Sequence, residues 1–291
     1  MPSKQDDSDL VLFEREDSTA ILTMNRPEYR NAQNLALLYA LDAAFERALD
    51  DDDVKVIVVT GAGEHFSAGH DIGTPDRAVD VQYPRRAALW LTYVGRPGAE
   101  ERFAREQEIY LEMCRRRRDI PKPTIAMVQR TCIAGALMLV WSCDLIVASA
   151  DAYFSDPVVR MGIPGVEYFA HPWELGPRLA KEALFTGGKI TAQRGYAVGM
   201  VSRIASRDEL REATLALCED IAQMPRFGLT LAKKAVNQAE DLMGLRAGMD
   251  ASFALHQLGH PHNAETIGHS NGGQSVESIR STVNNANRSE R

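Results

Sequence analysis

The sequence predicts an α/β fold that is followed by an all-helical C-terminal region. Strand, helix and strand patterns recur up to about residue 206, which is typical of crossover units rather than of a β-sandwich. Helical patterns dominate after that point, and 291 residues with 45% hydrophobic content suit one large globular domain or slightly more. We expect a flexible tail at residues 1–9, a core at 10–205, a helical region at 206–262 and a disordered tail at 263–291.

The first half of the core is predicted from apolar patterns and breaker residues. Residues 10–16 and 19–25 read as the two strands of a hairpin, and Pro27 ends the second strand. Asn34 is placed to cap a helix whose apolar residues recur at helical spacing. Residues 54–60 form a largely apolar run, which indicates a buried strand.

Two loops of small residues carry the first functional signal. One spans residues 61–72 after the apolar strand, and the other, at residues 134–136, joins a strand pattern at 124–128 to an apolar helical run. Small residues let a ligand approach the backbone, and the first amides of a helix have no internal acceptor. Each loop alone could be a tight turn that packs a helix on a sheet. Two such loops together can supply two converging amide donors, which is an oxyanion hole.

Two segments allow two interpretations each. The stretch 73–105 is irregular and contains several prolines and glycines, so it is either a functional lid or an ordinary helical insertion. A helix predicted near residues 104–118 ends in four arginines, for which a solvated face is favoured over a contact with phosphates. The residues of the first segment that could face a ligand are Arg85, Arg86, Trp90 and Tyr93.

Composition narrows the classes of partner. The net charge of -7 argues against nucleic acid. No apolar run reaches membrane-spanning length, so no membrane partner is expected, and the polar first ten residues lack the apolar segment of a signal peptide. The four cysteines stand at unrelated spacings, which favours reduced thiols and a cytoplasmic location.

Three histidines near the C-terminus raise the question of a metal. His256 and His260 are four residues apart and can share one face of a helix, with His262 close behind. No carboxylate or thiolate stands at metal-ligand spacing beside them. We therefore expect a histidine cluster near a helix C-terminus, and the sequence predicts no metal site.

Several short motifs, in this order, resemble the crotonase, or enoyl-CoA hydratase/isomerase, superfamily. The resemblance covers roughly residues 10–260, and it depends on the number and order of the motifs rather than on any one of them. Along the chain they are Met24-Asn25-Arg26-Pro27-Glu28 with Asn31-Ala32, Gly61-Ala62-Gly63, Phe66-Ser67-Ala68-Gly69-His70-Asp71-Ile72, Pro123-Thr124-Ile125-Ala126, Ala134-Gly135-Ala136, Cys143-Asp144, Met161-Gly162-Ile163-Pro164, Leu184-Phe185-Thr186-Gly187 and Gly199-Met200-Val201.

The resemblance implies a crotonase-like spiral of β-β-α units that binds an acyl-CoA thioester and stabilises its enolate. By position, the two amides that would hold the enolate oxygen belong to His70 and Gly135. Acyl-CoA is then the substrate, and no separate cofactor is expected. The helical region would cover the active site and build a homotrimer or a dimer of trimers. The positions that would contact CoA are Arg26, Ala68, Asp71, Ile72 and Ala134.

The chain departs from the resembled hydratases at both catalytic positions. Those enzymes use two glutamates, one to activate water and one to deliver a proton. Here the corresponding positions hold Met138 and Val158, which cannot titrate. The hydratase mechanism therefore does not transfer. Isomerisation, hydrolysis and hydration by a rearranged acid pair stay open, as does a scaffold that binds acyl-CoA without turnover.

Two carboxylates lie near these positions in the sequence. Asp156 precedes Val158 by two residues, so it faces the same side of an extended backbone, but it equally fits a turn aspartate held by local amides. Glu167 follows a glycine-containing turn where the resembled enzymes contact the acyl end of the thioester. We favour Glu167 as the acid or base, with Asp156 orienting it or holding a water. Tyr168 and His171 are further polar partners by position.

Overall fold

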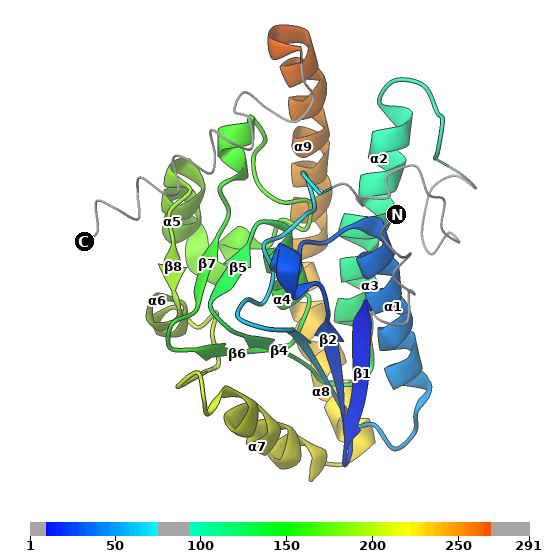
Figure 1. The fold of residues 1–291 in the computed structure, drawn as a ribbon, viewed down its shortest axis with the longest axis vertical. Helices are drawn as coiled ribbons and strands as arrows, with labels where there is room; N and C mark the ends of the chain where they lie inside the picture. Colours follow the sequence, from blue (N-terminus) through cyan, green and yellow to red (C-terminus); the bar gives the residue numbers. More distant parts are fainter. Residues whose placement is uncertain (1–9, 75–92, 269–291) are drawn as a thin grey trace.

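The computed structural model describes residues 10–74 and 93–268, in which helices surround two sheets (Figure 1). The larger sheet has six strands in the order β1-β2-β3-β4-β6-β9. β1 pairs antiparallel with β2, as predicted for the hairpin, and the other pairs are parallel. The strands of this sheet are β1 (Val11–Glu16), β2 (Thr19–Met24), β3 (Val56–Gly61), β4 (Thr124–Val128), β6 (Leu145–Ser149) and β9 (Arg203–Ala205).

The smaller sheet alternates with the larger one along the chain. Its order is β5-β7-β8, with β5 and β7 parallel. After β4 the chain forms β5 and then helix α4, and after β6 it forms β7 and then helix α5. These are the β-β-α units expected from the sequence. Their elements are β5 (Thr131–Ile133), α4 (Gly135–Trp141), β7 (Tyr153–Ser155), α5 (His171–Thr186), β8 (Ile190–Thr191) and α6 (Ala192–Ala197).

Helices cover both faces of the larger sheet, because its central strands are apolar on both sides. On β2, Leu22 belongs to the main core together with Leu41 of α1 (Leu35–Asp50), whereas Ile21 packs in a second cluster with Leu217 of α7 (Leu210–Ala222). The predicted cap of α1 is present, since the Asn34 side chain accepts a hydrogen bond from the Leu37 amide at 2.8 Å. The core therefore fixes β3, from which the first small-residue loop leaves, and β4, which leads through β5 to the second loop.

The helix predicted near residues 104–118 begins earlier and contains a wide turn. It consists of α2 (Glu100–Glu106), a π-helical segment at Gln107–Glu112 and α3 (Met113–Asp119). π-helical turns are often found at functional sites, because they shift which side chains face inward. Residues 75–92 of the proposed lid, with Arg85, Arg86 and Trp90, lie outside the described residues. Tyr93 is buried.

The interpretation of the four arginines as a solvated face is wrong. Arg117 and Arg118 are buried, and Arg118 pairs with Glu240 at 2.8 Å and with Asp241 at 3.1 Å. Arg115 pairs with Asp250 at 2.7 Å. The sequence pattern could not show this, because the two C-terminal helices that supply these acids return across α3.

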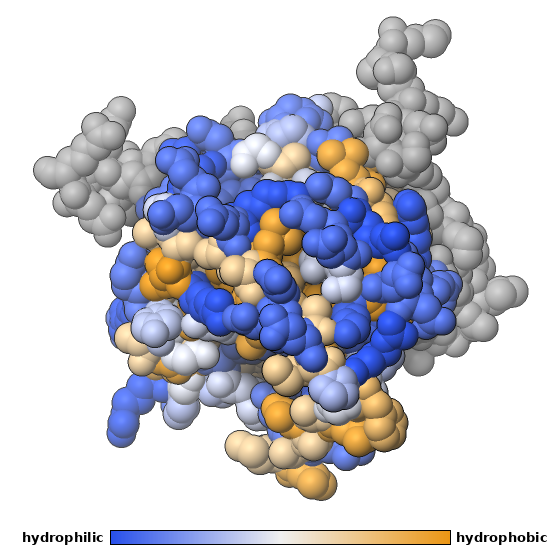
Figure 2. Space-filling model, turned by 90° about the horizontal axis from the view of Figure 1, so that it is seen from below, coloured by the Kyte–Doolittle hydropathy of each residue, from blue (hydrophilic) through white to orange (hydrophobic). Residues whose placement is uncertain are grey.

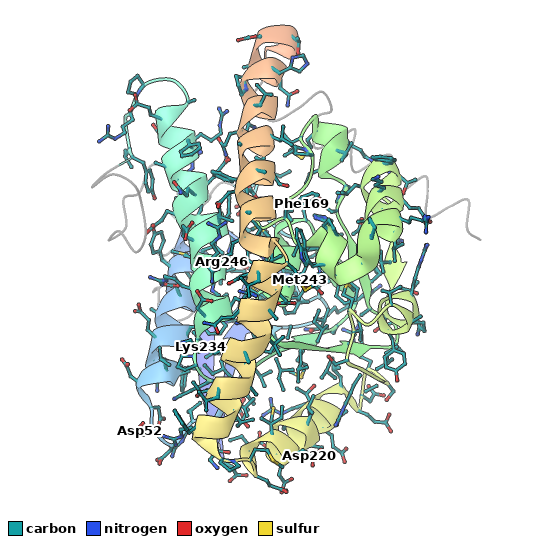
Figure 3. The ribbon with its side chains drawn as sticks, turned by 180° about the vertical axis from the view of Figure 1, so that it is seen from behind. Asp52, Phe169, Asp220, Lys234, Met243 and Arg246 are labelled. Atoms are coloured by element: carbon teal, nitrogen blue, oxygen red, sulfur yellow. The ribbon has the colours of Figure 1, made fainter. Side chains whose placement is uncertain are left out.

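Those two helices, α8 (Arg226–Leu242) and α9 (Leu245–Ile267), run along the back of the molecule (Figure 3). They meet at Gly244, whose φ of 97° is the left-handed conformation that favours glycine. α8 has no buried residue, whereas α9 contributes Met249 and Phe253 to the main core. α9 continues to Ile267, past the expected end of the helical region at residue 262. Within the described ranges, no helix has the length and apolar character needed to cross a membrane.

Candidate active site

The two small-residue loops contact each other. The Ile133 amide donates a hydrogen bond to the Ser67 carbonyl at 3.2 Å. Gly69 has a φ of 86°, and a Cβ there would lie 2.4 Å from the Ile133 carbonyl oxygen and 3.0 Å from the Gly135 nitrogen. Glycine is therefore required at residue 69, both for its conformation and for the close approach of the second loop.

The backbone directs the two predicted amide donors away from the sheet hydrogen bonds. The Gln33 amide donates to the Gly69 carbonyl and the Asp71 amide donates to the Gln33 carbonyl, at 2.8 and 3.0 Å, which is the pattern of a parallel bridge. Successive amides of an extended backbone alternate in direction, so the His70 amide points away from Gln33. Gly135 is the first residue of α4, so its amide has no acceptor within the helix. Their joint action on an oxyanion stays a prediction.

The His70 ring lies directly over Gly135. A Cβ on Gly135 would lie 2.2 Å from His70 Cδ2, so only glycine fits under the ring. The same ring stacks on Tyr110, with ring centroids 3.7 Å apart and planes at 13°. Tyr110 comes from the π-helical segment. Burial lowers the pKa of His70 to about 4, and the ring is therefore neutral near pH 7.

Glu167 lies beside this ring and is almost fully buried. Its Oε2 is 3.9 Å from His70 Nε2, and within the described part of the chain neither atom has a hydrogen-bond partner. Burial raises the pKa of Glu167 well above its usual range, and the charges of Glu106 and Asp156 act in the same direction.

α9 brings His256 to the other oxygen of Glu167. His256 Nε2 lies 3.4 Å from Glu167 Oε1, and its Nδ1 lies 2.8 Å from the Gly165 carbonyl oxygen. Because a carbonyl only accepts, Nδ1 carries the hydrogen. The sequence singled out His256, but without its partner, since Glu167 is remote along the chain.

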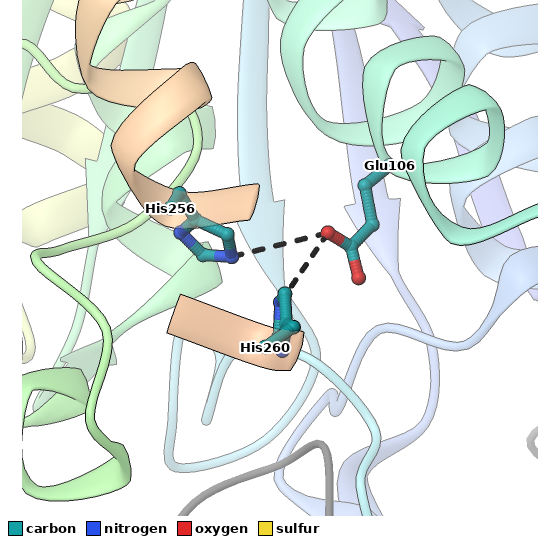
Figure 4. Close-up of side chains that lie close together, drawn as sticks. All are labelled: Glu106, His256 and His260. Carbon is teal, nitrogen blue, oxygen red and sulfur yellow. Dashed lines mark ion pairs between the residues drawn. The ribbon is translucent and has the colours of Figure 1, made fainter. Parts of the chain in front are cut away.

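Glu106 of α2 adds a second buried carboxylate (Figure 4). Its Oε2 lies 3.5 Å from His260 Nε2 and 3.9 Å from His256 Nε2, and it accepts a hydrogen bond from Gln257 Nε2 at 2.6 Å. Burial opposes ionisation of Glu106, but the hydrogen bond and charge of His260, then the charge of His256, lower its pKa below the usual value. The two neighbouring carboxyls, Glu106 and Glu167, therefore have pKa values shifted in opposite directions.

Sequence reasoning missed Glu106 and Tyr110. Both lie in a helix that carries no family motif. The two residues follow the stretch 73–105, which the sequence left open as either a lid or a helical insertion. The available signal was a glutamate followed at helical spacing by Ile109 and Tyr110, which places a carboxylate on a face that is otherwise apolar. That signal is weak without the knowledge that α9 packs there.

Local groups hold the Asp156 carboxylate, which agrees with the interpretation of Asp156 as a turn aspartate. It accepts hydrogen bonds from the Val158 amide at 3.3 Å and the Val166 amide at 3.0 Å, and pairs with His171 Nε2 at 2.9 Å. Since both oxygens are engaged, Asp156 fixes the turn that precedes Glu167. The role of Asp156 in orienting Glu167 stays a prediction.

The two apolar residues at the replaced glutamate positions are buried. Met138 and Val158 belong to the main core. The Tyr168 amide approaches Met138 Sδ at 3.5 Å, which places the thioether beside the residue that follows Glu167. Tyr168 itself is buried in the same core.

The residues expected to contact CoA fall into two groups. Arg26 is fully buried, and its guanidinium pairs with Asp71 at 3.1 Å and donates to the Ala32 carbonyl, so both side chains hold the loop in place. Ile72 is 40% exposed on the same loop. Ala68 and Ala134 are partly exposed. The contact of all five residues with CoA stays a prediction, and the exposed members offer the direct surface.

Comparisons with known proteins agree with this architecture. The family model described as enoyl-CoA hydratase/isomerase matches residues 14–86 and 96–269. A putative enoyl-CoA hydratase, EchA13 of Mycobacterium tuberculosis, is 44% identical over 255 residues, which are 86% of this chain and 79% of that protein. A probable enoyl-CoA hydratase from Mycobacterium smegmatis has a crystal structure that superposes with a TM-score of 0.79 at 46% identity, covering 89% of this chain and 98% of the other.

A second crystal structure gives the same result. The probable enoyl-CoA hydratase from Mycobacterium thermoresistibile superposes with a TM-score of 0.78 at 47% identity, covering 88% of this chain and 98% of the other. The fold is thus the crotonase fold expected from the motifs. With a family match over most of its length and the two-loop geometry in place, the chain belongs to the enoyl-CoA hydratase/isomerase family.

Proposed function

We propose that this protein is an enzyme that forms and reprotonates the enolate of an acyl-CoA thioester. In this proposal the amides of His70 and Gly135 hold the enolate oxygen, and Glu167 carries the proton. One observation supports it most. Within the described residues, a buried oxygen of Glu167 has no hydrogen-bond partner and lies 3.9 Å from the ring of His70, the residue proposed to supply one of the two amides. The carboxyl that we propose as the proton carrier therefore lies beside the side chain of the residue that we propose as an amide donor.

The chemistry follows from what the two groups do. A thioester α-carbon loses a proton only when the charge that moves to the oxygen is stabilised, and loss of one such amide typically costs about 3–4 kcal/mol. A carboxylate in an apolar site is a stronger base than one in water, because burial disfavours its charge. Met138 and Val158 supply apolar surroundings of this kind.

We further propose double-bond isomerisation as the reaction. In that reaction one carboxylate takes a proton from one carbon, the double bond moves, and the same carboxyl returns the proton two carbons away. No water is consumed, so one proton carrier suffices. Hydration needs a second group to activate water, and the positions of the hydratase pair hold Met138 and Val158. A monofunctional enoyl-CoA isomerase from M. smegmatis is among the structural relatives, at 25% identity and a TM-score of 0.63.

We also propose that the protein assembles as a homotrimer or a dimer of trimers. α8 and α9 expose many large apolar side chains, and a surface of that kind marks an interface. Figure 2 shows the lower face, where apolar side chains gather toward one edge of a mostly polar surface. A cytoplasmic location is part of the same proposal. The exposed apolar residues of the two helices are Phe227, Leu231, Val236, Leu242, Leu255 and Leu258.

The experiment compares two substrates with the purified protein. Conversion of a 3-enoyl-CoA to its conjugated 2-enoyl isomer is followed beside hydration of crotonyl-CoA. We expect isomerisation with weak hydration, and Glu167→Gln should lower the isomerisation rate about 10²–10⁴-fold. Glu174→Gln, which changes another desolvated carboxyl, is the matched control and should keep the wild-type rate.

Two results would contradict the proposal. Robust hydration of crotonyl-CoA would show that a rearranged acid pair replaces the missing glutamates. Binding of acyl-CoA without turnover of either substrate would favour a scaffold that binds CoA thioesters and does no chemistry.

A further inference from the structure

A second cluster of ligating side chains lies next to Glu167 and has no part in the proposed reaction. One ring nitrogen of His256, one ring nitrogen of His260 and a carboxylate oxygen of Glu106 all lie within 4.8 Å of one another. All three residues are buried. The two histidines are four apart on α9, and Glu106 faces them from α2 (Figure 4). The sequence alone suggested no metal, because this carboxylate is far away along the chain.

The spacing of the three atoms is close to that of a metal ligand set. Ligands about 2.1 Å from a tetrahedral zinc ion are about 3.4 Å apart. Glu106 Oε2 lies 3.5 Å from His260 Nε2 and 3.9 Å from His256 Nε2. Small side-chain rotations would therefore bring the set to metal-binding distances without movement of either helix.

The hydrogen bonds around the cluster are those of a ligand set. Metal-binding histidines usually donate their other ring N–H to a carbonyl or carboxylate, which orients the ring. His256 does this, since its Nδ1 donates to the Gly165 carbonyl oxygen at 2.8 Å. Gln257 Nε2 orients Glu106 in the same way at 2.6 Å. In neutral His256, Nε2 then presents its lone pair to the oxygens of Glu106 and Glu167, so a cation between them would relieve the repulsion.

We propose that His256, His260 and Glu106 bind one divalent transition-metal ion, with Zn²⁺ as the best match to two imidazoles and a carboxylate. A water molecule would complete the tetrahedral set. The ion would join α9 to α2 beside the candidate active site. This site does not depend on the proposed acyl-CoA chemistry, because its ligands are neither Glu167 nor the two amide donors.

Zinc binding by the full-length chain tests the proposal. The protein is stripped with a chelator and titrated with ZnCl₂ by calorimetry, and with CoCl₂ by absorption spectroscopy. We expect one ion per chain and the intense visible bands of a tetrahedral Co²⁺ site. His260→Gln and Glu106→Gln should each weaken Zn²⁺ binding by about 100-fold or more, since loss of an orienting hydrogen bond alone costs roughly 10–100-fold. His262→Gln is the matched control, because His262 is an exposed histidine on the same helix.

Melting curves give an independent readout. An ion that binds only the folded chain raises its melting temperature, so Zn²⁺ should stabilise the wild type and His262→Gln but not His260→Gln. Absence of stoichiometric binding by the wild type would overturn the proposal. Equal affinity in His260→Gln or Glu106→Gln, whichever folds, would overturn it too, because the ion would then sit elsewhere.

Discussion

Gly135 lies under the His70 ring, and the contact leaves no space for a side chain. A Cβ there would be 2.2 Å from Cδ2 and 2.3 Å from Nε2 of the ring. Tyr110 stacks on the same ring and limits how far the ring can move. The same residue therefore has to be small for packing and, in our proposal, for the approach of the thioester.

The first prediction concerns this contact. Gly135→Ala should lower the free energy of unfolding by about 1–3 kcal/mol, the usual cost of overpacking. The double variant Gly135→Ala, His70→Ala should recover most of the loss, since the clash needs both side chains. Urea denaturation measures each value. Gly228→Ala, where a Cβ meets nothing within 4 Å, is the control, and the contact would be unimportant if both glycine variants behaved alike.

The second prediction concerns Glu174 and pH. Burial, with a smaller contribution from the charge of Glu240, raises the pKa of Glu174 from 4.5 to about 8. Between these pH values the folded chain keeps a proton that the unfolded chain has released, so raising the pH favours unfolding. From pH 5 to pH 8 the wild type should therefore lose stability relative to Glu174→Gln. Denaturation curves of both proteins across this range check it, and parallel pH profiles would refute it.

The sequence predicted part of the candidate site, and the reason is physical. The two loops were found because small residues leave a local pattern, whereas His70, Gly135 and Glu167 were assigned by position in the family resemblance. The structure brings these three residues together. Glu106 and Tyr110 leave no such pattern, because their position depends on a π-helical turn and on packing against α9. Residues that come together only through tertiary contacts could not be predicted from the sequence.

Local sequence patterns predicted the strands better than they predicted the surroundings of the helices. The predicted strands at residues 10–16, 19–25 and 54–60 agree with β1, β2 and β3 to within one or two residues, since apolar alternation and breakers define strands locally. The arginine run of α3 was misjudged, because charge runs are usually exposed and this one is covered by the return of α8 and α9.

The third prediction tests how α3 holds α8. Arg118→Met keeps the apolar stem but removes contacts with Glu240, Asp241 and the Asn237 carbonyl, at 2.8, 3.1 and 2.9 Å. We expect a loss of about 1–3 kcal/mol in the free energy of unfolding, as for hydrogen bonds to charged groups. Arg194→Met, which removes an exposed ion pair, should leave stability unchanged. Equal effects of both substitutions in urea denaturation would contradict the account.

The exposed apolar residues of α8 support the proposal that the protein forms an oligomer. α8 buries no residue in the single chain, and Val236 and Leu242 on it are 61% and 91% exposed. A helix with an apolar face and nothing to cover it is stable only if a partner buries that face. A second copy of the chain is the partner that the resemblance implied.

The fourth prediction is that light scattering gives the mass of a trimer or hexamer at micromolar concentration. The double variant Val236→Asp, Leu242→Asp should shift the protein to smaller species, because charges would be buried at the interface. Phe185→Asp, a matched change of an exposed apolar residue on α5, should keep the wild-type mass. A monomeric wild type would contradict the proposed assembly.

Enolate formation is the central step of the proposed function, and hydrogen exchange measures it most directly. A saturated acyl-CoA is incubated with the protein in D₂O, and mass spectrometry follows deuterium at the α-carbon. We predict that the wild type and Glu174→Gln incorporate deuterium, and that Glu167→Gln does so about 10²–10⁴-fold more slowly while still binding the acyl-CoA. Exchange at the rate of buffer alone in the wild type, or equal rates in wild type and Glu167→Gln, would contradict the account.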